Sequence, residues 1–198
     1  MAHEVKDFSA LLGTLQGISD EQLQAHFTLY QGYVKKINEI EEKLAGADRA
    51  LANYSFGEYS ELKRREAVPL MGTYLHQAYF ENLSGAGGDP SDAVKKGIES
   101  AFGSFDSWQA DLKAAAASTP GWVLLTRSAI DGRFHHYILF EHHLHYPVHQ
   151  QPLLVLDCWE HAYFLDYKTN KGGYVDAFIA NMNWAEVNAR ATGGGIKP

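Results

Sequence analysis

The residues of this chain best suited to chemistry lie in the short stretch 157–163, which follows an apolar run at residues 152–156. The length and branching of that run predict a buried strand. Asp157 would then stand at the end of the strand, with His161 one turn into the segment that follows. A carboxylate and an imidazole four residues apart can share one metal ion if the backbone turns between them. This spacing is common by chance, so a metal site can be inferred only from the residues around these two positions.

Two further histidines lie in segments with helical periodicity. His26 falls on the apolar stripe of a predicted helix over residues 19–44, and His76 lies in an aromatic-rich predicted helix over residues 58–83. Taken alone, either one would be interpreted as a core histidine whose ring nitrogens are satisfied by neighbours.

The strings around these positions are more specific than the spacing. Residues 157–163 read Asp-Cys-Trp-Glu-His-Ala-Tyr, which resembles the Asp-x-Trp-Glu-His-Ala-Tyr signature of the iron/manganese superoxide dismutases. Residues 74–83 resemble the segment that carries the family's second ligand, and residues 18–38 resemble its first helix. The resemblance covers about residues 5–190. It implies four metal ligands in chain order: His26, His76, Asp157 and His161.

Three imidazoles and one carboxylate form a donor set of intermediate softness, which suits iron, manganese, zinc or copper better than calcium or magnesium. The resemblance implies superoxide dismutation by one iron or manganese ion per chain, and we favour iron. Two alternatives stay open: a metal-binding protein of the same fold without the activity, and a zinc hydrolase with a metal-bound water as nucleophile.

Other positions around the expected metal differ from the family pattern. Tyr33 matches the family's channel tyrosine, but it lies seven residues after His26 where the family usually has eight. Gly72 stands where many iron members carry a glutamine that hydrogen-bonds the metal-bound solvent. Counting back from Asp157, the spacing matches members that use a histidine for this contact and indicates His142. Two neighbouring histidines remain alternatives to it: His143 and His145.

The same resemblance predicts a homodimer, and leaves a tetramer open. Glu160 would hydrogen-bond the ligand histidine of the other subunit, and Tyr163 would lie near the same interface. Trp122, Trp159 and Trp184 would wall the metal site.

The predicted fold class is α+β: a hairpin of two long helices, then a three-stranded antiparallel sheet covered by helices. Ser19 and Gln22 form a plausible capping box at the start of the first helix. Pro69 could kink or break the second helix. Further helices are predicted at residues 92–102, 105–117 and 173–190, and strands at 122–126, 134–141 and 152–156.

Composition and the glycine-rich stretch 84–89 set the organisation. That stretch predicts a boundary between an N-terminal helical hairpin domain, 1–86, and a C-terminal α/β domain, 87–198, with the metal site between them.

The net charge of -7 argues against nucleic acid or anionic lipid as the main partner, and no apolar stretch would span a membrane. A single cysteine, Cys158, and no signal-peptide pattern favour the cytoplasm.

Overall fold

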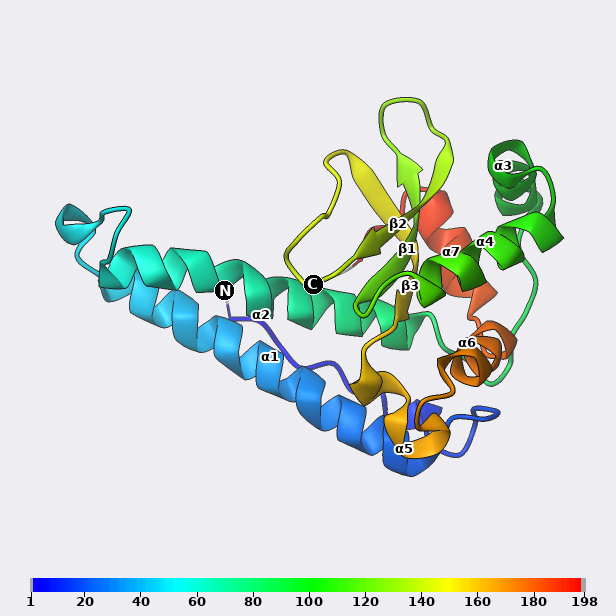
Figure 1. The fold of residues 1–198 in the computed structure, drawn as a ribbon, viewed down its shortest axis with the longest axis horizontal. Coiled ribbons are helices and arrows are strands. Elements are labelled where there is room, and N and C mark those ends of the chain that lie inside the picture. Colours follow the sequence, from blue (N-terminus) through cyan, green and yellow to red (C-terminus); the bar gives the residue numbers. More distant parts are fainter. Residues whose placement is uncertain (1, 197–198) are drawn as a thin grey trace.

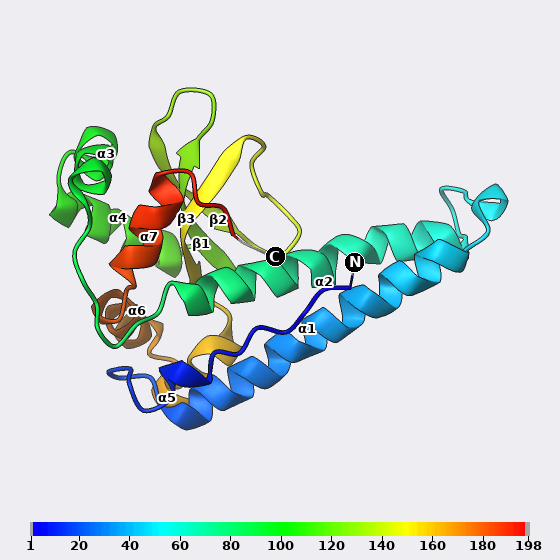
Figure 2. The same ribbon diagram turned by 180° about the vertical axis from the view of Figure 1, so that it is seen from behind.

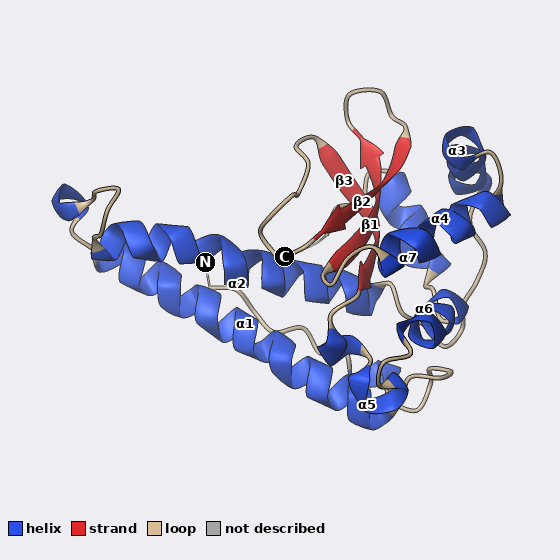
Figure 3. Ribbon diagram, viewed as in Figure 1, coloured by secondary structure: helices blue, strands red, loops and turns tan. Residues whose placement is uncertain are grey.

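A computed structural model describes residues 2–196, and the α+β fold class is confirmed in it (Figure 1). Two long helices form an antiparallel hairpin, and a small sheet with further helices lies beside one end of that hairpin (Figure 3). None of the helices in the described part of the chain is long and apolar enough to cross a membrane. The helices are α1 (Asp20–Gly46), α2 (Glu58–Glu81), α3 (Asp92–Phe102), α4 (Phe105–Ala117), α5 (Phe164–Tyr167), α6 (Lys171–Ala180) and α7 (Trp184–Ala191), and the strands are β1 (Trp122–Ser128), β2 (Phe134–Leu139) and β3 (Gln150–Asp157).

The hairpin is built on an apolar stripe of α1. Leu23, Val34 and Ile37 are buried on that stripe, as its three- and four-residue steps predict. Pro69 lies inside α2, which continues as one helix across it, so of the two alternatives, a kink or a break, the break does not occur. Figure 2 shows the N-terminal arm running along the two helices. There the backbone amide of Lys6 donates to the hydroxyl of Tyr30.

The sheet has the strand order β2-β1-β3, with both pairs antiparallel. β1 is therefore the central strand, and its side chains are buried at every position except Arg127. The register pairs Trp122 with Asp157, which brings the last residue of β3 beside the first residue of β1. Helices α3 and α4 contact β2, and α2 and α7 contact β3. The end of β3 is thereby held close to α2.

The expected tail helix is wrong as a single element, because residues 181–183 separate α6 from α7. Tertiary contacts override helix propensity at this break. The side chain of Asn181 accepts from the backbone amide of Gln16 and donates to its carbonyl, at 2.9 and 2.7 Å. Met182 forms an isolated antiparallel bridge with Leu83, and Asn183 caps the start of α7. The break therefore ties the tail to two earlier segments.

The remaining elements agree closely with the sequence. Helices α3 and α4 have the predicted bounds, while α1 runs two residues longer and α2 two residues shorter than expected. β2 ends at Leu139 rather than at residue 141. The boundary expected between residues 86 and 87 falls in the loop from α2 to α3. The division into domains 1–86 and 87–198 stays a prediction.

Candidate metal centre

Four side chains from separate elements converge on one point. His26 comes from α1 and His76 from α2, Asp157 is the last residue of β3, and His161 lies in the short 3-10 helix η3 (Glu160–Ala162). One donor atom from each lies within 4.8 Å of all the others. Helices α1 and α2 and strand β3 are regular elements, so the three donors that they carry are held in fixed positions.

The distances between these atoms fit donors arranged around a common ion. Oδ2 of Asp157 lies 3.2 Å from Nε2 of His26, 3.1 Å from Nε2 of His161 and 3.5 Å from Nε2 of His76. Nε2 of His76 and Nε2 of His161 are 3.3 Å apart. Ligands about 2.1 Å from a metal lie roughly 3.0 to 3.4 Å from their neighbours. The donor set and its spacing therefore fit a single transition-metal ion.

Hydrogen bonding and burial leave the imidazoles in the state that a metal needs. Nδ1 of His76 donates to the carbonyl of Gly72 at 2.6 Å, which leaves Nε2 without a proton and facing the centre. Burial lowers the pKa of His26 and lowers the pKa of His76 well below its ordinary value. Both rings are therefore neutral at neutral pH, as metal ligation requires.

Asp157 supplies the negative charge of the centre. Burial by itself would raise its pKa, but the contacts with His161 and His26 outweigh burial and hold the pKa below its ordinary value. Its Oδ1 atom accepts from the amide of Trp159 at 2.9 Å, and its carbonyl accepts from the hydroxyl of Tyr174 at 2.7 Å. The carboxylate is thus oriented so that Oδ2 faces the histidines.

Tyr33 and His142 lie together beside the four-residue cluster. The Tyr33 ring stacks on His76 with centroids 5.1 Å apart, and its hydroxyl is 2.7 Å from Nε2 of His142. Nε1 of Trp122 donates to Nδ1 of His142 at 3.0 Å. α1 is a regular α-helix from Asp20 to Gly46, so the seven-residue spacing from His26 brings Tyr33 to the cluster without a bulge.

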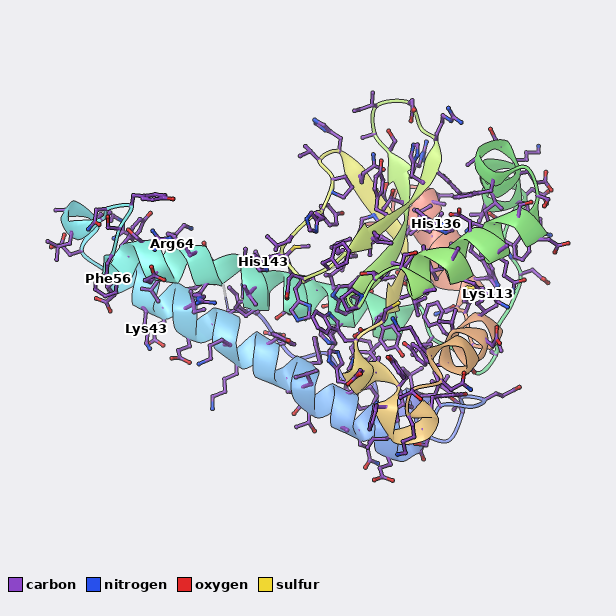
Figure 4. All side chains as sticks on the ribbon, in the orientation of Figure 1. Lys43, Phe56, Arg64, Lys113, His136 and His143 are labelled. Carbon is purple, nitrogen blue, oxygen red and sulfur yellow. The ribbon has the colours of Figure 1, made fainter. Side chains whose placement is uncertain are left out.

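The two alternative histidines lie elsewhere. His142 is only 5% exposed, with His76 5.6 Å away between ring centroids. His143 lines a cavity with Met71 of α2, on the loop between β2 and β3 (Figure 4). His145 is exposed and contacts the ring of Phe140. Both members of the adjacent pair lie beyond the end of β2, so strand alternation does not orient them, and burial identifies His142 as the residue that faces inward.

Glu160 and Tyr163 do not belong to the converging cluster. Glu160 is exposed, and within the described residues its side chain has no hydrogen bond or ion pair, while its backbone carbonyl accepts from the amide of Tyr163 at 3.1 Å. Tyr163 is buried and its ring stacks on Tyr174 at 5.2 Å. Phe164, which follows Tyr163 in the chain, is 42% exposed although it is apolar.

Sequence reasoning missed two tyrosines that support the centre. Tyr174 bonds the carbonyl of Asp157, and its hydroxyl is 3.1 Å from that of Tyr79. The ring of Tyr79 lies 5.1 Å from that of His26. Neither residue has a local motif, because each contact joins elements that are far apart in the chain. Of the three expected tryptophans, Trp122 and Trp159 adjoin the centre, whereas Trp184 packs against Trp108.

Comparison with known proteins gives consistent matches. A family model described as the C-terminal domain of the iron/manganese superoxide dismutases matches residues 90–190. A superoxide dismutase [Fe] from Aquifex aeolicus is 45% identical over 89% of this chain and 85% of its own length. One from Cupriavidus metallidurans, also named [Fe], is 37% identical over 96% of both chains. A superoxide dismutase [Mn] from Haloferax volcanii is 34% identical over 87% of this chain and 86% of its own.

Proposed function

The chain belongs to the iron/manganese superoxide dismutase family, and from this premise we propose that His26, His76, Asp157 and His161 hold one ion per chain. The protein converts superoxide to dioxygen and hydrogen peroxide. When bound, iron or manganese supplies the one-electron cycling that this reaction needs. The observation that carries the proposed ligand set is the convergence of four donor atoms within 4.8 Å.

The proposed task of Tyr33 and His142 is to hold and pass protons. An indole N–H can only donate, so Nδ1 of His142 accepts from Trp122 and the neutral ring carries its proton on Nε2. That N–H then donates to the Tyr33 oxygen, which leaves the Tyr33 hydroxyl proton free to be given to another acceptor. Burial lowers the pKa of His142 and raises that of Tyr33, so both groups are neutral at pH 7.

We propose iron as the ion of this chain. Support comes from the relatives of 45% and 37% identity, both named [Fe], although other relatives are named [Mn]. Gly72 lacks the glutamine that many iron members carry, so manganese is the competing outcome. Metal analysis of protein produced with each ion supplied decides between them, and zinc alone in every sample would contradict a redox role.

We propose a homodimer with Glu160 and Tyr163 at its interface, and a tetramer would be assembled from two such dimers. Support comes from the single chain, where Glu160 is exposed and two apolar residues a few positions later in the sequence, Phe164 and Leu165, are 42% and 43% exposed. In the dimer, the carboxylate of Glu160 would hydrogen-bond His161 of the other subunit and orient that ligand.

The proposed compartment is the cytoplasm. Burial raises the pKa of Cys158 to about 12, so its thiol stays protonated.

Reconstitution tests the proposed centre. Apo-protein is titrated with Fe²⁺ or Mn²⁺ under argon, the bound metal is counted, and the decay of a superoxide pulse is followed. We expect one ion per chain and catalysed decay. The variant His76→Ala should lose stoichiometric metal and activity while keeping the native circular dichroism spectrum. Full retention of bound metal by His76→Ala would show that the ligand set is wrong.

A further inference from the structure

The start of α1 departs from the capping box that its sequence predicts. One half of the box is present, because Oγ of Ser19 accepts from the amide of Gln22 at 3.1 Å. In the other half, the Gln22 side chain would return to the amide of Ser19. That amide donates instead to Oδ2 of Asp166, at 2.8 Å, from the segment that follows η3.

Because Asp166 satisfies the Ser19 amide, the Gln22 side chain is free to make other bonds. Its Nε2 donates to the carbonyl of His161 at 2.5 Å, and its Oε1 accepts from the amide of Leu165 at 3.0 Å. Gln22 is only 1% exposed, and both bonds are partly buried. Both polar atoms of one side chain are thereby used on one short segment, which joins η3 to α5 beside the first turn of α1 (Figure 1).

This segment carries the ligand that is least supported by regular structure. η3 has three residues, and the side chain of His161 is 29% exposed, whereas those of the other three ligands are at most 1% exposed. Gln22 lies four residues before His26 on α1, so the two side chains share a helix face. A bond from Gln22 to the His161 backbone therefore sets the position of one ligand relative to another.

We propose that Gln22 is a positioning residue of the metal centre, which clamps the 161–165 segment onto α1 and so holds His161 in its ligating position. This role rests on the proposed metal site. It predicts that loss of the clamp weakens metal binding beyond any effect on the fold, because a displaced His161 must be reordered each time an ion binds.

The test compares Gln22→Met with Gln24→Met. Methionine keeps the length of the side chain and its helix propensity but cannot make either hydrogen bond. Gln24 is the matched control, since it is an exposed glutamine two residues along the same helix. A second variant, Gln22→Asn, keeps an amide that is one methylene too short to reach both partners, and it serves if Gln22→Met does not fold.

Binding of Mn²⁺ to each apo-protein is measured by calorimetry, and thermal unfolding is followed with and without Mn²⁺. We expect Gln22→Met and Gln22→Asn to raise the Kd about 10-fold. The increase in unfolding temperature caused by Mn²⁺ should shrink accordingly, while Gln24→Met matches the wild type. An unchanged Kd, with apo and Mn²⁺-bound proteins destabilised equally, would mean that Gln22 has only a structural role. Failure of the wild type itself to bind either Mn²⁺ or, under argon, Fe²⁺ would overturn the proposed centre and this inference with it.

Discussion

The ring of Tyr33 lies against Gly72, so closely that a Cβ added to this glycine would come within 2.7 Å of Cδ1 of the ring. The same ring stacks on His76, whose Nδ1 donates to the carbonyl of Gly72. A residue without a side chain at position 72 therefore gives Tyr33 the space that it occupies beside the centre. The absence of a glutamine at position 72 and the position of Tyr33 are therefore linked, because a side chain at position 72 would overlap the Tyr33 ring.

Gly72→Ala should destabilise the protein although it places a better helix former in α2. Helix propensity alone would favour alanine by about 1 kcal/mol, but overpacking costs about 1–3 kcal/mol. The clash is with the inner ring atoms of Tyr33, which cannot move without shifting the ring away from His76. Urea unfolding of Gly72→Ala shows whether its free energy of unfolding is lower than that of the wild type. Gly32→Ala is the control, because this α1 glycine has nothing near its Cβ position and should stabilise the protein.

His142→Ala should lower the superoxide dismutase activity by about 10-fold or more, while the protein retains its metal. The variant removes the group that links Trp122 to Tyr33 and leaves the buried indole N–H of Trp122 without an acceptor. Activity and bound metal are measured together. His143→Ala and His145→Ala serve as controls and should behave like the wild type. Near-normal activity in all three variants would place the proton-donating group elsewhere.

Much of this architecture follows from local patterns, and the exceptions have tertiary causes. The serines that precede α3 and α4 cap their helices with side-chain bonds, so both starts could be predicted. The capping box predicted at Ser19 forms only in part. The amide of Ser19 donates to Asp166, which is 147 residues away in the sequence, and not to the side chain of Gln22. Tyr174 and the break at Asn181 depend likewise on partners distant in sequence. No local pattern encodes such contacts.

Glu160→Ala should weaken the proposed dimer and reduce activity together. The carboxylate is exposed and unpaired within the described chain. The proposed dimer would bury it, and it would then need a hydrogen-bond partner from the other subunit. Sedimentation velocity over a dilution series should show more monomer than in the wild type. Glu42→Ala, which removes an exposed glutamate near the C-terminal end of α1, should change neither property. A Glu160→Ala protein that stays dimeric and fully active would contradict the interface.

We expect His136 to make the stability of the metal-loaded protein sensitive to acid. Its side chain on β2 is 4% exposed, and its Nδ1 lies 2.6 Å from Oδ2 of Asp111 on α4, outside the metal centre (Figure 4). Burial lowers the pKa of His136 below 6.5, and Asp111 offsets only part of this effect. The unfolded chain therefore binds a proton at higher pH than the folded protein does. The contribution of neutral His136 to stability is complete above pH 6.5 and is lost as the pH falls through the folded-state pKa.

Replacing either partner should change that pH dependence in opposite directions. His136→Phe places an uncharged ring beside Phe102, whose centroid is 4.7 Å from that of His136, and should flatten the loss of stability between pH 7 and 5. Asp111→Asn removes the carboxylate that, within the described residues, pairs with the His136 imidazolium, and it should steepen the loss of stability. Urea midpoints of the metal-loaded proteins are compared at both pH values, so that bound metal keeps the ligand histidines from titrating. His136→Phe removes the group that takes up the proton, whereas Asp111→Asn removes the carboxylate that stabilises the protonated form. If the urea midpoints of both variants change with pH in the same way, the acid sensitivity arises at other groups.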